Sequence, residues 1–190
     1  DKLAFELIER EKQLGRDIDG IIRVESGLGA SGIPHIGSLG DAVRAYGVKL
    51  ALENLGYKSE LIAYSDDLDG LRKIPEGLLP NKKTEKEWEK KYLGKRVSEI
   101  PDPDDECRRN KGRGCESYGE HMSSLLTDGL DKLRIKYEPK TAHETYKNNL
   151  LKDQIHEILV NSKKIGDEIK ELTGQEKFQT ILPYFPVCDG

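Results

Sequence analysis

The amino-acid sequence predicts an α/β fold in which helices flank a parallel sheet. Two short runs rich in aliphatic and β-branched residues, 20–26 and 60–65, enclose a segment, 36–55, whose apolar residues recur at helical spacing. Strand, helix and strand with short connections form a βαβ unit, whose crossover is right-handed. At 190 residues the chain can bury a core in one domain with a small insertion.

The first elements follow in order from the N-terminus. We expect a helix over 1–18, because its apolar residues share one face, and then a strand over 20–26. Three glycines and a proline exclude regular structure between 27 and 35, so this segment is a loop. The helix over 36–55 ends at a glycine, and the second strand covers 60–65.

After the second strand the pattern changes. Residues 67–116 are highly charged, and Trp88 is the one large apolar anchor in their central part, so we predict an insertion with little core of its own. A helix over 117–134, a third strand at 135–138 and a long amphipathic helix over 150–173 follow.

Composition and charge exclude several classes of protein. Hydrophobic and charged residues are each 35%, and the net charge of −4 does not suit a general binder of polyanions. No apolar run approaches the roughly 18–20 residues of a membrane helix, and the first residues lack the order of a signal peptide. Three cysteines do not make a disulfide framework, so we expect a cytoplasmic protein.

The loop over 27–35 carries the chemistry. It joins the end of a strand to the start of a helix, which is where open parallel sheets bind ligands. The free N–H groups and partial positive charge of a helix N-terminus favour phosphate. His35 is placed to donate to a phosphate oxygen, and Gly37 leaves space for a flat ring. These features predict a nucleotide site. The alternative is that His35 only starts the helix and the glycines only form the turn.

Three stretches carry a resemblance to a known family. Pro34-His35-Ile36-Gly37, within VESGLGASGIPHIGS at 24–38, resembles the HIGH signature of class I aminoacyl-tRNA synthetases. DDLDGLRKIP at 66–75, and PDP at 101–103 followed by CESYGEH at 115–121, are similar to the archaeal-type class I lysyl-tRNA synthetases. The resemblance extends from about residue 20 to the end of the sequence.

The resemblance implies a Rossmann-like HIGH-type nucleotide-binding fold, incomplete here, with an inserted zinc-type segment. Residues 1–66 would form its first βαβ half, 67–116 the insertion, and 117–190 the continuation of the catalytic domain and the start of a connective insertion. No KMSKS-like loop occurs in the sequence. We therefore expect an N-terminal fragment that is weakly active or inactive alone. Its oligomeric state is left open.

The resemblance also implies a reaction. ATP, with Mg²⁺, would activate lysine as lysyl-adenylate, and the lysine would then pass to tRNA, with the rate arising from positioning and electrostatics. His35 and Ser38 would be catalytic, Ser38 standing where many members have a second histidine. The implied ATP-binding residues are Gly29, Ala30, Ser31, Gly32, His35, Gly37 and Ser38.

Lysine requires a carboxylate for its ammonium group, because a buried unpaired charge is costly. Glu25, Asp66 and Asp67 lie near predicted strand ends, and the sequence does not choose among them. Asp66 and Asp67 would equally well cap the following turn. By the resemblance, Gly27 lines the same cleft.

A metal site is expected in and after the insertion. Asp102, Cys107, Cys115 and His121 offer a carboxylate, two thiolates and an imidazole, a donor set that suits tetrahedral zinc. Asp102, Cys115 and His121 match the family's zinc pattern, whereas Cys107 in place of a missing histidine is our own inference. The alternative is two reduced cysteines and a helix-start histidine. Cys188 is expected to be an orphan ligand or a free thiol.

Two other functions compete with this interpretation. A small nucleotidyltransferase of HIGH type would be complete at this length, although its later basic signature is missing. A zinc-stabilised module without enzymatic activity would hold RNA through the basic stretch at 108–113. Nucleotide exchange would identify the first, and steeply salt-dependent RNA binding, lost on Arg108→Glu and Arg109→Glu, the second.

Overall fold

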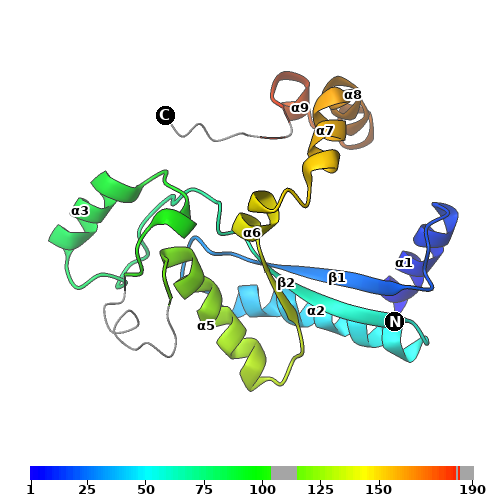
Figure 1. The fold of residues 1–190 in the computed structure, drawn as a ribbon, viewed down its shortest axis with the longest axis horizontal. Helices are drawn as coiled ribbons and strands as arrows, with labels where there is room; N and C mark the ends of the chain where they lie inside the picture. Colours follow the sequence, from blue (N-terminus) through cyan, green and yellow to red (C-terminus); the bar gives the residue numbers. More distant parts are fainter. Residues whose placement is uncertain (104–114, 183, 185–190) are drawn as a thin grey trace. The chain divides into compact units, whose positions relative to one another are not determined.

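The structure, a computed structural model, describes residues 1–103, 115–182 and 184. By contacts the chain divides into two compact units, Asp1–His143 and Glu144–Gly190, each described here by itself. No helix in the described ranges is long and apolar enough to cross a membrane. The elements of the first unit, seen in Figure 1, are α1 (Lys2–Gln13), β1 (Ile21–Leu28), α2 (Ile36–Asn54), β2 (Lys58–Ser65), α3 (Lys82–Tyr92), η1 (Val97–Glu99), α5 (Tyr118–Lys132), β3 (Glu138–Thr141) and the start of α6 (Ala142–Lys147).

The described part of the chain contains one parallel sheet, with strand order β1–β2–β3. Leu28 lies opposite Ser65, and Ser65 lies opposite Thr141, so the three strands end level with one another. The α/β fold with a parallel sheet is confirmed. Its consequence for function is that the segments that follow the three strands, two loops and the start of α6, meet at one edge.

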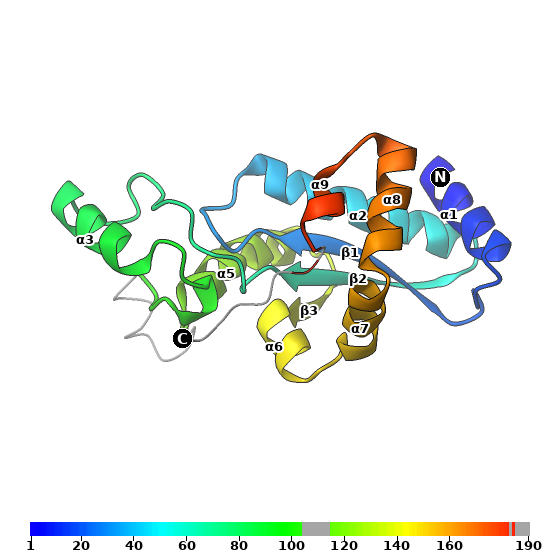
Figure 2. The same cartoon turned by 90° about the horizontal axis from the view of Figure 1, so that it is seen from above.

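Helices α2 and α5 cover one face of this sheet (Figure 2). Side chains alternate along a strand, so every second residue of β1 and β2 points toward these helices. At the middle of this layer Leu61 packs with Ala42 and Leu130, and each is at most 1% exposed. Burying one such leucine contributes roughly 1.5–3 kcal/mol. Helix α1 packs against the C-terminal half of α2 through Ala4, Ile8, Ala51 and Leu52.

The segment between β2 and α5 has more core than we predicted, so that expectation was wrong. Leu71, Val97 and Ile100 are at most 1% exposed and form one cluster with the start of α5. Trp88 packs against this cluster, and its ring centroid lies 4.8 Å from that of Tyr92. The expectation rested on the charged residues around Trp88, whereas the buried apolar residues lie on either side of them.

The third strand begins later than the sequence indicated. We expected it at 135–138, but β3 is Glu138–Thr141. Helix α5 ends in a turn that uses these residues: Arg134 has φ 57°, and the Ile135 N–H donates to the Leu130 carbonyl at 3.0 Å. Ile135 is therefore a buried anchor of the helix end and not a strand residue.

The second unit contains the rest of α6, α7 (Lys152–Val160), α8 (Ser162–Thr173) and α9 (Lys177–Thr180). We expected one helix over 150–173, but it divides at Asn161, whose side-chain amide donates to the Glu157 carbonyl at 2.9 Å. Such local side-chain bonds compete with a continuous helix. The backbone of Gly166 in α8 lies against the Phe178 carbonyl of α9, which leaves no space for a Cβ.

We expect Leu130→Ala to lower the free energy of unfolding by about 2–5 kcal/mol, because it leaves a cavity between α5 and the sheet. Leu125→Ala, on the same helix but 42% exposed, should change it by less than about 1 kcal/mol. Urea denaturation of both variants measures the difference. Equal losses would contradict the described core.

Candidate active site

The site is built where the three strands end. The Asp66 N–H donates to the Leu28 carbonyl at 3.2 Å, which continues the pairing of β1 and β2 beyond the strands. One residue further, Asp67 Oδ1 accepts from the His143 N–H in the first turn of α6 at 2.8 Å. Asp67 thereby joins the end of β2 to the helix that follows β3. This edge holds the predicted Glu25, Gly27, Asp66 and Asp67.

His35 is the N-cap of α2 and closes its first turn. Its Nδ1 accepts from the Gly37 N–H at 3.0 Å, and Ser38 Oγ accepts from the His35 N–H at 3.5 Å. A Cβ on Gly37 would lie 2.8 Å from His35 Cε1, so only glycine leaves room for the ring in this position. The predicted helix-start role of His35 is thus present in the structure.

This capping also determines what His35 can offer to a ligand. An Nδ1 that accepts a hydrogen bond carries no proton, so in the neutral ring the proton is on Nε2. The His35 side chain is exposed. Its Nε2–H is therefore available as a donor at the positively polarised N-terminus of α2, an arrangement that suits a phosphate oxygen.

Strand β1 includes Gly27 and Leu28, so the predicted loop begins two residues later than expected and covers 29–35. This loop, called the nucleotide loop below, is held at its centre and open on either side. Ala30 is 1% exposed and packs into the core. Tyr118 Oη donates to the Ser31 carbonyl at 3.2 Å, and burial raises the pKa of Tyr118 to about 12, so the hydroxyl keeps its proton. A Cβ on Gly29 or Gly32 would meet nothing within 4 Å.

Negative charge accumulates at the strand ends. The pKa of Asp66 is raised, first because partial burial removes water from its carboxylate, and then because Asp69, Glu25 and Asp67 repel its charge. Gly27 lies against this residue, since a Cβ there would be 3.6 Å from Asp66 Oδ2. A cation bound at this cluster would relieve the repulsion.

A cavity of about 470 Å³ opens beside the end of β1. Ser26, at its wall, is 5% exposed, and its Oγ has no hydrogen-bond partner among the described residues. The cavity has both charged and apolar walls, the latter from α1, β1 and α2. Its lining residues are Leu3, Val24, Glu25, Ser26, Gly27, Asp41, Arg44, Ala45 and Val48.

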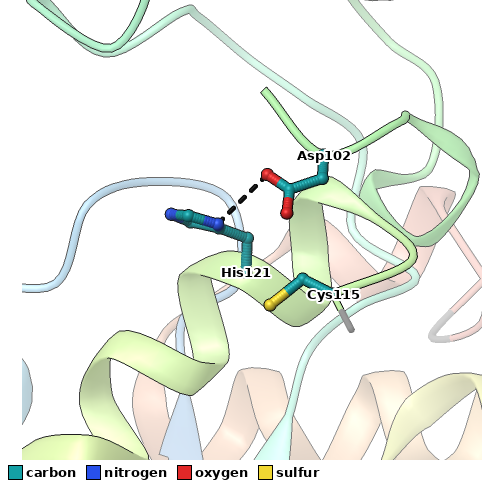
Figure 3. Close-up of side chains that lie close together, drawn as sticks. All are labelled: Asp102, Cys115 and His121. Atoms are coloured by element: carbon teal, nitrogen blue, oxygen red, sulfur yellow. Dashed lines mark ion pairs between the residues drawn. The ribbon is translucent and has the colours of Figure 1, made fainter. Parts of the chain in front are cut away.

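A second cluster lies at the start of α5. Asp102, Cys115 and His121 come together there, with one potential ligand atom from each lying within 4.8 Å of the others (Figure 3). His121 Nδ1 is 3.1 Å from Asp102 Oδ1, and Asp102 and Cys115 are buried. The fourth predicted ligand, Cys107, lies outside the described residues, as do Cys188 and the basic stretch at 108–113.

Reasoning from the sequence missed three contributors to the site. Tyr118 stands within the CESYGEH stretch, but no pattern indicated that its hydroxyl reaches a loop 87 residues earlier. The tie between Asp67 and His143 likewise spans 76 residues. Asp69 carried a detectable signal, because a third acidic residue so soon after Asp66 and Asp67 would raise the local negative charge.

Parallel strands that end level with one another, flanked by helices, define an α/β domain whose candidate ligand edge lies at the carboxyl ends of its strands. The family described as class I tRNA synthetases (K) matches residues 1–190, and the chain belongs to this family.

Curated relatives agree with this assignment. Lysine–tRNA ligase of Cenarchaeum symbiosum (strain A) is 59% identical over 189 residues, covering 99% of this chain and 33% of the relative. A second Cenarchaeum symbiosum lysine–tRNA ligase is 56% identical over 190 residues, covering 100% and 33%. The lysine–tRNA ligase of Rickettsia bellii (strain OSU 85-389) is 35% identical over 170 residues, covering 89% and 30%. The chain thus spans about a third of the length of these relatives.

The raised pKa of Asp66 has a consequence for stability. A carboxyl group whose pKa is higher in the folded state stabilises that state while protonated, and this contribution is lost as pH rises through the folded pKa. We expect Asp66→Asn to unfold at higher urea concentration than the wild type at pH 7. The difference should disappear below the ordinary aspartate pKa of 3.8.

Urea denaturation across a pH series measures this difference, with Asp19→Asn, an exposed aspartate, as the control. A variant less stable than the wild type at pH 7 would contradict the described repulsion.

Proposed function

We propose that this chain supplies the ATP and lysine sites of a lysine–tRNA ligase. The observation that carries the proposal is the match of the whole chain to the synthetase family and to lysine–tRNA ligases at up to 59% identity. The geometry supports it: a phosphate-suited helix start lies next to an acidic cluster at one edge of the sheet. Neither competing function has a comparable observation in its favour.

The proposed reaction has two steps. A carboxylate oxygen of lysine attacks the α-phosphorus of ATP, the bond to the β-phosphate breaks, and pyrophosphate leaves with its electron pair. A ribose hydroxyl of tRNA then attacks the carbonyl carbon of lysyl-adenylate, and AMP leaves as the hydroxyl proton is lost. Mg²⁺ would offset the phosphate charge when bound. The residues of this chain bind and orient the reactants, which is the usual source of rate in such transfers.

His35, Ser38 and the nucleotide loop form the proposed ATP site. The Nε2–H of His35 donates to a phosphate oxygen, while its Nδ1 stays engaged with the Gly37 N–H. Ser38 acts first on the protein, through its hydrogen bond to the His35 N–H, and so keeps the cap in place. The open sides at Gly29 and Gly32 let the nucleotide approach the backbone.

Among the three candidate carboxylates, Asp66 is the proposed partner of a lysine ammonium group, with Glu25 beside it. Asp67 is buried and engaged with His143, which favours a positioning role. The carboxylate of Asp66 is destabilised by its neighbours, so pairing with a cation lowers its pKa and is favourable. The cavity beside Glu25 offers space for the rest of the amino acid.

Asp102, Cys115 and His121 are the proposed zinc ligands. Carboxylate, thiolate and imidazole are all zinc donors, and their present spacing requires only small movements to reach bonds of about 2.0–2.3 Å. Zinc bound there would hold the buried Asp102 segment to the start of α5. Cys107 remains the proposed fourth ligand.

We expect His35→Ala to lower lysine-dependent exchange of pyrophosphate into ATP by about 10²-fold, the usual cost of one donor to a reacting charge. The assay uses residues 1–190 fused to the remaining part of the Cenarchaeum symbiosum (strain A) relative, because the chain covers 33% of that protein. His156→Ala, an exposed histidine of α7, is the matched control.

The intact relative serves as the active reference for the fusion. Exchange that depends on an amino acid other than lysine would contradict the proposed substrate. A folded fusion without exchange, beside an active intact relative, would contradict the proposed activity.

We expect the purified chain to hold one zinc ion, measured by elemental analysis. Cys115→Ser should lower the zinc affinity at least tenfold, because a hydroxyl replaces the thiolate ligand. Cys188→Ser, outside the proposed set, should leave the zinc content unchanged. Full zinc binding by the Cys115 variant would contradict the assignment.

A further inference from the structure

We infer that Tyr118 is a positioning residue for the nucleotide loop, an inference that rests on the ATP site proposed above. Tyr118 is the first residue of α5 and its side chain is fully buried. Its hydroxyl donates to the Ser31 carbonyl at 3.2 Å. This hydrogen bond connects the centre of the loop to the beginning of a core helix.

The first turn of α5 is itself firmly held, so Tyr118 has a fixed base. The Tyr118 N–H donates to the Ile100 carbonyl at 2.8 Å, and the adjacent residues Pro101 and Ser117 form an antiparallel bridge. Ser117 is the N-cap, and its Oγ accepts from the Glu120 N–H at 3.2 Å. The ring of Tyr118 packs into the same cluster as Ala30.

The proposed zinc ligands lie around this same turn. Cys115 precedes Tyr118 by three residues, His121 follows it by three, and Asp102 lies against His121 from the neighbouring segment. Ligand binding that orders the first turn of α5 would therefore also order the Tyr118 hydroxyl. Tyr118 thus links the turn that carries His121 to the nucleotide loop.

The nucleotide loop needs such a support. Glycine residues at 29 and 32 have open space around them and a wide choice of backbone conformations, which makes a defined loop costly in entropy. Burial of Ala30 fixes the path of the chain, and the hydrogen bond to Ser31 fixes the orientation of the next peptide group. A loop ordered before ATP arrives binds it more tightly than one that orders on binding.

The test is Tyr118→Phe, which keeps the buried ring and removes the hydroxyl. We expect the backbone order parameters of residues 29–32, measured by ¹⁵N relaxation without nucleotide, to fall from about 0.85 toward 0.6, while those of α5 stay unchanged. The ¹³C′ shift of Ser31 should change with the loss of its donor. The dissociation constant for ATP should rise about five- to tenfold, as for the loss of one hydrogen bond.

Tyr137→Phe is the matched control, because Tyr137 follows the other end of α5 and its hydroxyl donates to Asp131 in the last turn of that helix at 3.2 Å. It should leave the loop and ATP affinity unchanged. An unchanged loop in Tyr118→Phe, or order lost equally in the loop and in α5, would overturn the inference. Failure of the wild type to bind ATP would count against the proposed function alone, since loop order is measured without nucleotide.

Discussion

Level strand ends are the constraint on which the rest of the structure depends. Parallel pairing puts the last residues of β1, β2 and β3 at one edge, so two loops and a helix start that are distant in sequence lie together there. Asp67 holds this edge together by accepting from the His143 N–H. This edge sets the positions of the nucleotide loop, the start of α6 and the acidic cluster, which consists of Glu25, Asp66, Asp67 and Asp69.

The acidic cluster illustrates how a site is maintained at a cost in stability. Asp66 is half-buried among like charges, which is unfavourable for the protein alone. Asp67 lies next to it in sequence but is engaged with the backbone of α6. Two adjacent carboxylates thus have different environments: Asp67 accepts a backbone hydrogen bond, whereas Asp66, the proposed partner of the lysine ammonium group, is repelled by its acidic neighbours. Strain of this kind concentrates where ligands bind.

Much of this arrangement was predictable from the sequence, and the remainder depended on distant contacts. The strands before and after α2, the parallel sheet and the approach of Asp102, Cys115 and His121 follow from local patterns and from the family resemblance. The late start of β3 did not, because Arg134 adopts a left-handed conformation that its residue type does not signal. The hydrogen bond between Tyr118 and Ser31 joins residues with no shared pattern. The roles of His35 and Asp66 toward ligands stay predictions.

The pairing of β2 with β3 also has a kinetic consequence. The bond from His143 to Asp67 closes a loop that spans 76 residues, whereas β1 and β2 are joined through one helix. Closing a long loop costs chain entropy before any contact repays it, which slows folding. The apolar cluster around Leu71 and Val97 lies within this loop, and its early collapse would shorten the chain that β3 must bring back. The apolar residues between β2 and α5 would then speed the pairing of β3 at the sheet edge where the candidate site lies.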